Sequence, residues 1–555
     1  MRRRELLIAA TGAAVGGAAP LFAARMGGGE AVPAPAAGDE RARCLAVAES
    51  LKPTLTETEQ RPLALVRPVA DASLVLRFHM ETEAPAEQLG DRLLGKGDSF
   101  VLDFGGHRTG HLSFDLVGEG RGVDAPARLR FTFGEVPTDV AEPLYPYEGQ
   151  LSSSWLPDEL VNVDFLPQHV RLPRRYAFRY VKVEVLDTSS TFKVRFRNVR
   201  AHALTSALKT PAPLLAGSEL VRRIDEVSIA TLRDCMQTTF EDGPRRDQRL
   251  WVGDLRLQAL ANYATFQQND LVKRCLYLFA GLTREDGLVG ACVYEKPRPS
   301  YGGIHIFDYA LLYNATLLDY VRATGDVATG RDLWPVARRQ VEILGRTVGA
   351  DGLFVDPRNL WLFIDWHEKL HRDAAIQGVL VYALQATLDL ARAIGRETEV
   401  ADYPERIARM KSAARRAFWD GASRLFVSGP QRQVSWASQA WLAIAGVVER
   451  DDAAAAMRGA LALPEAVRPK TPYLYHHVVE GLLASGLQRE ALGLVESYWG
   501  GMVAAGADTF WEVYDPENPL HSPYGDIHIN SYCHAWSCTP TYLFRSRGLA
   551  EADRA

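Results

Sequence analysis

The pattern of apolar and polar positions changes its period near Pro211. Between about 60 and 205, short runs alternate in polarity or are rich in β-branched and aromatic residues, with Gly, Asp and Pro between them. Such runs are typical of strands joined by turns. They lie at 73–78, 99–104, 111–116, 128–133, 180–185 and 192–196. Many short strands of this kind predict a β-sandwich, which we place at 45–205.

From Ser218 onward the apolar residues recur at every third or fourth position, which is the period of one helix face. Clear stripes lie at 255–266, 376–390 and 436–447. About ten to twelve such helices are predicted, and the breaks at 286–310, 351–373 and 508–534 are rich in polar and aromatic residues. This arrangement predicts a barrel of helical hairpins at 212–548, whose loops at one end build a cleft.

The N-terminus has the layout of an export signal. Arginines occupy positions 2–4, before an apolar, Ala- and Gly-rich run at 6–24. This is typical of a signal peptide of the twin-arginine type; a disordered basic tail is the alternative. Glycines and Pro20 interrupt the run, so it is a poor membrane span. We predict a signal peptide and linker at 1–36, with linker composition continuing to about 42, and a periplasmic or secreted mature protein without further membrane spans.

The composition limits which classes of partner and which kinds of site we expect. The net charge of −5 offers no general attraction to nucleic acid. The six cysteines form no CxxC pair and no disulfide framework; Cys533 and Cys538 are close enough in sequence to pair, and free buried thiols are the alternative. No EF-hand-like loop is present, and we expect no metal or cofactor. The 11 Trp and 20 Tyr suit stacking on sugars, although core packing explains most single aromatic residues equally well.

Two segments concentrate carboxylates of the kind that glycoside hydrolysis requires in pairs. The first, 241–254, holds four carboxylates, several arginines and a tryptophan, with a turn at Gly243 and Pro244. Its Asp254 opens an apolar helix, where an acidic residue suits the helix dipole. An exposed, salt-bridged loop is the alternative interpretation of this segment.

The second segment is 508–516, where Glu512 stands among Phe510, Trp511 and Tyr514. A carboxyl group in such surroundings is partly desolvated, which tunes its pKa. The alternative is a structural hydrogen-bond acceptor.

These motifs resemble those of the α-L-rhamnosidase family. The first segment resembles its Asp-Cys-Pro-x-Arg-(Asp/Glu) to Gly-Trp-x-Gly-Asp signature, and the second its Thr-x-Trp-Glu motif with a following Asn-His-Tyr-like segment at 530–534. Residues 101–106 and 179–183 resemble the β-domain that precedes the family's six-hairpin (α/α)₆ barrel. The likeness extends over most of 95–545. Gly243 replaces the usual Cys, and an ungapped match places Asp247, followed by Gln248, where many members carry Glu.

The resemblance implies an inverting glycoside hydrolase that releases terminal α-L-rhamnose, or a similar sugar, from an oligosaccharide or polysaccharide. By this likeness Asp247 is the general acid and Glu512 the general base. The candidate substrate-binding residues are Asp242, Arg246, Trp251, Asp254, Asp365, Trp366, Trp511 and His534. The loop of Asp365 could instead be an ordinary packed loop, and His534 a structural hydrogen-bonding residue.

Two other functions remain open at this point. A polysaccharide lyase could cleave rhamnosyl-glucuronate linkages by β-elimination, with Tyr301, His305 or His534 in the basic role and the arginines of 245–249 neutralising the uronate. A non-catalytic glycan-binding protein could use the same scaffold.

Overall fold

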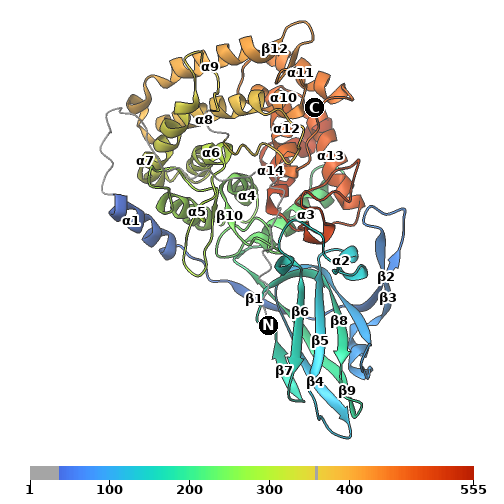
Figure 1. Cartoon of the computed structure of the whole chain (residues 1–555). Coiled ribbons are helices and arrows are strands. Elements are labelled where there is room, and N and C mark those ends of the chain that lie inside the picture. The colour runs from blue at the N-terminus through green and yellow to red at the C-terminus, as the bar shows by residue number, and fades with distance from the viewer. Residues whose placement is uncertain (1–36, 357–359, 555) are drawn as a thin grey trace, which may run out of the picture.

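The computed structural model describes residues 37–356 and 360–554, which form an antiparallel β-domain and a larger helical domain side by side (Figure 1). This is the predicted order of a β-sandwich followed by a barrel of helical hairpins. The predicted signal peptide and linker at 1–36 lie outside the described residues.

The β-domain is built around one long strand. Strand β4 (Ser99–Gly120) pairs with β8 and β2 along its first half and with β9 and β7 along its second half, so it joins two groups of strands within one nine-stranded sheet. Apolar side chains of the sheet pack into one core, in which the ring centres of Phe114 and Phe131 are 5.2 Å apart. The other strands are β1 (Thr56–Gln60), β2 (Ala64–Ala70), β3 (Phe78–Pro85), β5 (Ala127–Gly134), β6 (Asp158–Val163), β7 (Gln168–Arg171), β8 (Tyr176–Asp187) and β9 (Phe192–Thr205). The predicted strands at 99–104 and 111–116 are therefore one element.

The predicted strand at 73–78 is wrong. These residues form the turn of the β2–β3 hairpin, closed by a hydrogen bond from the Asp71 amide to the Arg77 carbonyl (2.8 Å), and β3 begins only at Phe78. The apolar positions that suggested a strand have another cause, because Leu76 is buried in the core of the helical domain.

A helix that the sequence did not predict precedes the sheet. Helix α1 (Ala37–Ser50) packs on α5 (Asn269–Gly281) and buries Cys44 and Ala48 in the barrel core. Residues 37–42, expected as linker, and 45–50, expected in the β-sandwich, thus belong to a helix that packs on the barrel. The first strand begins at Thr56.

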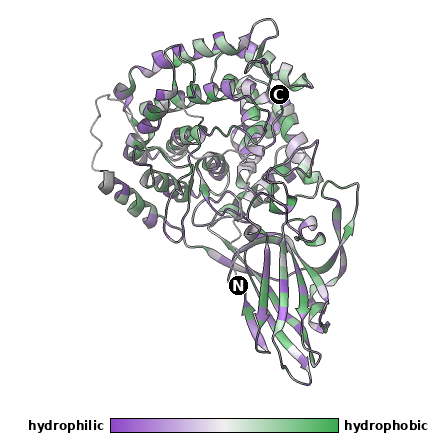
Figure 2. Ribbon diagram, viewed as in Figure 1, coloured by the Kyte–Doolittle hydropathy of each residue, from purple (hydrophilic) through white to green (hydrophobic). Residues whose placement is uncertain are grey.

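Twelve helices of the described chain form the barrel, alternating between an inner and an outer ring. The inner ring is α4 (Val252–Ala264), α6 (Phe307–Thr324), α8 (Asp373–Ile394), α10 (Trp436–Ile444), α12 (Pro472–Ala484) and α14 (Pro540–Ser546), and α14 closes onto α4. The outer helices are α3 (Glu219–Cys235), α5, α7 (Val327–Leu344), α9 (Tyr403–Phe418), α11 (Arg450–Ala462) and α13 (Gln488–Ala504). Hydrophilic residues recur along outer helices such as α9 (Figure 2), as expected where one face meets solvent.

Helix α8 is long and apolar enough to cross a membrane by composition, but 83% of its most apolar window is buried inside the protein. It is a core helix of the barrel. The loops that precede the inner helices gather at the end of the barrel that faces the β-domain, and the short helix α2 (Pro137–Ala141) of the β-domain lies against them.

Candidate active site

A cavity with a volume of about 70 Å³ opens at the N-terminal ends of the inner helices. Its lining residues are Asp242, Arg246, Asp247, Trp251, Asp254, Ile306, Tyr309, Trp361, Phe363, Trp366, Glu512, Tyr524, His534 and Trp536. Residues 270 positions apart thus share one cavity, because each comes from a loop that precedes an inner helix or from the first turn of one.

The loop between α3 and α4 is fixed by its own backbone. The Asp242 amide donates to the Arg249 carbonyl (2.8 Å), and the Arg249 amide donates to the Asp242 carboxylate (3.1 Å). Strand β10 (Leu250–Trp251) then pairs with β11 (Cys292–Val293), which directs Trp251 to the cavity. Helix α4 follows at once and carries Asp254 in its first turn.

Arg245 and Arg246 are neighbours with different tasks. Arg245 donates two hydrogen bonds to Asp139 (2.7 and 2.8 Å) and contacts Glu135 (3.3 Å), both in the β-domain. Arg246 reaches the cavity, where its guanidinium donates to Glu512 (2.8 Å) and its Nε lies 3.5 Å from Asp247. One arginine therefore anchors the loop, and the other contacts both candidate catalytic carboxyl groups.

Glu512 is buried and is surrounded by hydrogen-bond donors. Besides Arg246, it accepts hydrogen bonds from the Tyr524 hydroxyl and from the Ser531 amide (3.2 Å). Burial opposes its ionisation, but the charge of Arg246 and the hydrogen bonds from Arg246 and Tyr524 outweigh burial and hold the pKa of Glu512 below its usual value. An ionised carboxylate at this position can accept a proton from water.

Asp242 and Asp254 behave in the opposite way. Burial, followed by the charge of Asp247, raises the pKa of Asp242 well above its usual value, and burial together with Glu512 does the same for Asp254. One carboxyl oxygen of Asp254 is buried without a hydrogen-bond partner. Such a group is unsatisfied until a ligand supplies a donor, as a sugar hydroxyl does.

His534 lies between these two carboxyl groups, with its ring nitrogens 3.9 Å from Asp242 and 3.8 Å from Asp254. Burial lowers the pKa of His534 to about 4, so the ring is neutral near neutral pH. Its Nδ1 and the indole nitrogens of Trp251 and Trp366 are also buried without partners. The cavity therefore presents several unused polar atoms to a ligand.

Aromatic rings form the walls of the cavity. Phe363 meets Trp366 edge to face at 5.2 Å, and Trp366 meets Tyr524 at 6.0 Å. On the side of His534, the ring of Trp536 lies 4.4 Å away. Trp361 is 50% exposed and lies at the mouth. Polar atoms set between aromatic rings suit a ligand whose ring has an apolar face and hydroxyl groups at its edge.

Two predicted binding residues do not line the cavity. Asp365 accepts hydrogen bonds from the Lys470 amide (2.9 Å) and from the amide and hydroxyl of Thr471 (3.1 and 2.6 Å), so it secures the start of α12. Trp511 is buried behind the site against Tyr514 and Tyr532, because the chain alternates sides and turns its neighbour Glu512 inward. Both residues support the site from outside it.

Six further residues line the cavity that the sequence did not identify as site residues: Ile306, Tyr309, Trp361, Phe363, Tyr524 and Trp536. All six lie in or within three residues of the aromatic-rich breaks already noted, which was the available signal. Gln248, the neighbour of Asp247, does not line the cavity. Its backbone is left-handed (φ 51°), and its side-chain amide donates a hydrogen bond to the Pro244 carbonyl (2.8 Å). Of the two, Asp247 lines the cavity.

The six cysteines are free and buried. The sulfur of Cys533 lies 3.9 Å from that of Cys235, and the pairing of Cys533 with Cys538 that the sequence allowed is not formed. Of the residues considered for a lyase, Tyr301 and His305 pack on each other (5.4 Å between ring centres) and do not line the cavity, whereas His534 does.

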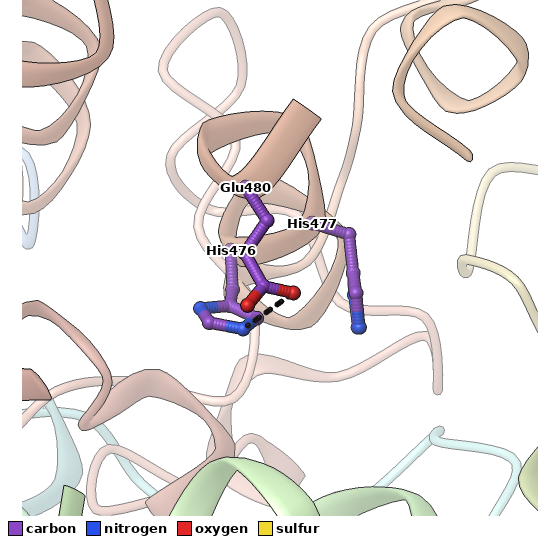
Figure 3. Close-up of side chains that lie close together, drawn as sticks. All are labelled: His476, His477 and Glu480. Carbon is purple, nitrogen blue, oxygen red and sulfur yellow. Dashed lines mark ion pairs between the residues drawn. The ribbon is translucent and has the colours of Figure 1, made fainter. Parts of the chain in front are cut away.

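A group of metal-ligand type lies on α12, where His476, His477 and Glu480 bring their ligand atoms within 4.8 Å of one another (Figure 3). Glu480 already pairs with His476 (3.4 Å) and with Arg256 (3.2 Å). Burial opposes ionisation of Glu480, yet Arg256 outweighs it and the pKa of Glu480 falls well below its usual value. A guanidinium that neutralises the carboxylate also repels a cation, so we assign no metal to this group.

Comparison with known families agrees with this geometry. The sequence profile of the glycosyl hydrolase family 78 alpha-rhamnosidase N-terminal domain matches residues 62–203. The profile of the bacterial alpha-L-rhamnosidase 6 hairpin glycosidase domain matches residues 214–547. A search of curated proteins found no match.

Several solved structures are similar. A rhamnosidase from Klebsiella oxytoca with rhamnose bound matches 91% of this chain and 99% of its own, at 46% identity and a TM-score of 0.89. The GH78 family rhamnosidase of Bacillus sp. GL1 matches 84% of this chain and 49% of its own, at 23% identity and a TM-score of 0.71, which shows the fold alone. Since the six-hairpin profile covers more than half of the sequence, the chain belongs to the bacterial α-L-rhamnosidases with a six-hairpin glycosidase domain.

Proposed function

We propose that the protein is an inverting α-L-rhamnosidase that removes terminal α-L-rhamnose from a glycan. The observation that carries the proposal is the cavity in which Asp247 and Glu512 are both contacted by the single guanidinium of Arg246. Glycoside hydrolysis requires two carboxyl groups that face one cavity. The likeness to a rhamnosidase with rhamnose bound supports the choice of sugar.

In the proposed reaction, Asp247 donates its proton to the glycosidic oxygen as the bond from that oxygen to the anomeric carbon breaks. Glu512 accepts a proton from the water that attacks the anomeric carbon from the other face. Inversion requires room for this water, so we expect the two carboxyl groups to lie about 6.5–9.5 Å apart. The lowered pKa of Glu512 keeps it ionised for this task.

The remaining cavity residues are proposed to hold the sugar. Asp242, Asp254 and His534 offer acceptors or donors for hydroxyl groups, and Trp251 offers its indole N–H. The rings of Trp366 and Trp536 can pack on the apolar face and methyl group of a 6-deoxy sugar. Arg246 positions both carboxyl groups.

The two alternatives have less support. A lyase base among Tyr301 and His305 would stand outside the cavity, and His534 would have to take that role in a cavity that already holds two candidate catalytic carboxyl groups. A non-catalytic binding protein has no need of a base whose pKa is held low by buried charges.

The test is proton NMR of the first product from an α-linked rhamnoside, with ultraviolet detection in parallel. Inversion yields β-rhamnose first and no ultraviolet-absorbing unsaturated uronate. If α-rhamnose appears first, inversion is wrong; an ultraviolet-absorbing product would favour the lyase, and binding without turnover would favour the binding protein.

We further propose that the chain is exported to the periplasm or beyond by the twin-arginine pathway, on the basis of arginines 3 and 4 before the apolar run. Changing Arg3 and Arg4 together to lysine should leave precursor in the cytoplasm, measured by cell fractionation. Unchanged export would contradict the proposal.

A further inference from the structure

The side of the cavity next to Asp247 carries a stacked arginine. The guanidinium of Arg249 lies 4.2 Å from the ring centre of Tyr294 and 5.9 Å from that of Trp155. Three separate segments meet here: the α3–α4 loop, the α5–α6 loop and the β-domain. Stacking covers the faces of a guanidinium and leaves its N–H edges available.

The edges of Arg249 have little protein to bind. Among the described residues, its side chain makes no hydrogen bond, and its one ion pair is with Asp247 at 3.7 Å, too long for a hydrogen bond. The side chain is 21% exposed, so a ligand can reach it. A planar, charged fork that is held by rings but lacks an acceptor is suited to a carboxylate.

The proposed mechanism predicts which part of the substrate lies beside Arg249. A terminal sugar fills the cavity, and the general acid stands beside the glycosidic oxygen, so the leaving group extends past Asp247. Arg249 is the cation next to Asp247 on this path. The turn from Tyr294 to Ser300, which carries the ring beside Arg249, also contains the exposed basic residues Lys296 and Arg298.

During catalysis, Arg249 loses the negative charge of its ion-pair partner Asp247. Asp247 must carry its proton when the substrate binds, and a neutral carboxyl group no longer balances the charge of Arg249. A carboxylate on the leaving group would restore the balance, and the rings of Trp155 and Tyr294 would pack on the sugar that carries it.

Resting on the proposed function, we propose that this protein prefers rhamnose linked to a uronic acid, whose carboxylate binds Arg249 between Trp155 and Tyr294. Hydrogen bonds to a charged group are stronger than those between neutral groups, so we expect a preference of about ten- to one-hundredfold. The preference is for the leaving group and is independent of how rhamnose itself is recognised.

The experiment compares a rhamnosyl-glucuronate disaccharide with its methyl ester, which has the same linkage and no charge. The wild-type protein should show a kcat/KM at least about tenfold higher for the acid than for the ester. R249Q should bring the ratio near one, and R249K should give an intermediate ratio because a point charge lacks the fork. The matched control is R298Q, which removes an exposed charge of the same turn and should leave the ratio within about twofold.

The wild-type ratio needs no variant and stands even if R249Q folds poorly. Equal rates on acid and ester, with turnover of an aryl α-L-rhamnoside, would overturn this inference and leave the proposed function intact. Failure to release rhamnose from all three substrates would overturn both. An equal loss of preference in R298Q and R249Q would also overturn it, because general charge attraction would then explain the ratio.

Discussion

Two buried aspartates, Asp139 at the domain interface and Asp254 in the cavity, are almost equally hidden from solvent, at 1% and 2% exposed. Asp139 accepts two hydrogen bonds from Arg245 and two more from backbone amides. Burial raises the pKa of Asp139, but Arg245 and His528 outweigh burial and lower this pKa to about 2. Asp254 has an unpartnered oxygen, and its pKa rises well above the usual value. Partners, rather than depth, decide which buried carboxylate is structural and which awaits a ligand.

The interface and the cavity are nevertheless connected. Glu135 of the β-domain accepts a hydrogen bond from the Tyr532 amide (2.7 Å) and contacts Arg245. The preceding amide, that of Ser531, donates to Glu512. The β-domain thus holds in place both loops that carry the candidate catalytic residues. The interface and the cavity differ in chemistry, but the same contacts support both.

The largest effect should come from the cavity. D247N and E512Q should each lower kcat by about a thousandfold or more, because proton transfer is lost while the fold keeps its framework. Aryl rhamnosides with a good leaving group should rescue D247N in part, and azide should rescue only E512Q. Steady-state kinetics and circular dichroism measure both points.

Near-normal turnover of a natural glycan by both variants would contradict the assignment of the catalytic pair. In that case the lyase alternative would regain support.

At the interface the large effect should be on stability. D139N should reduce the free energy of unfolding by about 3–5 kcal/mol, because it leaves Arg245 buried with an incomplete partner. The exposed pair of Asp187 with Lys96 (3.3 Å) offers a matched control, and D187N should change stability by less than about 1 kcal/mol. Chemical denaturation measures both, and equal effects would refute the comparison.

Removing the positive charge from the cavity should move the pH profile. Glu512 must be ionised to act, and Arg246 holds its pKa down against burial. R246Q should therefore raise the pKa of Glu512 and shift the acidic limb of kcat/KM upward by about 1–3 pH units. The surface variant R223Q, which removes a partner of Glu226, should leave the limb in place. An unshifted limb in R246Q would mean that another group controls it.

The smallest effect on stability should come from D254N. Because the pKa of Asp254 is raised in the folded protein, its carboxyl group loses favourable energy as pH rises from the unfolded pKa through the folded one. D254N should thus equal the wild type near pH 4 and become relatively more stable toward about pH 7. KM should rise as a sugar contact is lost. A loss of stability like that of D139N would show that Asp254 is structural.

Much of this protein could be predicted from the sequence because the relevant signals are local. The change from a period of two to a period of 3.6 near Pro211 separates sheet from helices, since each period reflects the geometry of one element. The cluster around Asp242, Asp247 and Asp254 and the aromatic surroundings of Glu512 were visible for the same reason.

Tertiary structure decided which side chains face the cavity. Trp511 and Glu512 are neighbours, yet one packs against Tyr532 and the other meets Arg246, and Asp365 is engaged by Thr471. The docking of α1 on α5, the turn at 73–78 and the link from Arg245 to Asp139 likewise depend on partners remote in sequence. Local pattern fixes the type of an element, whereas the direction of a loop side chain depends on contacts that form only when distant segments pack together.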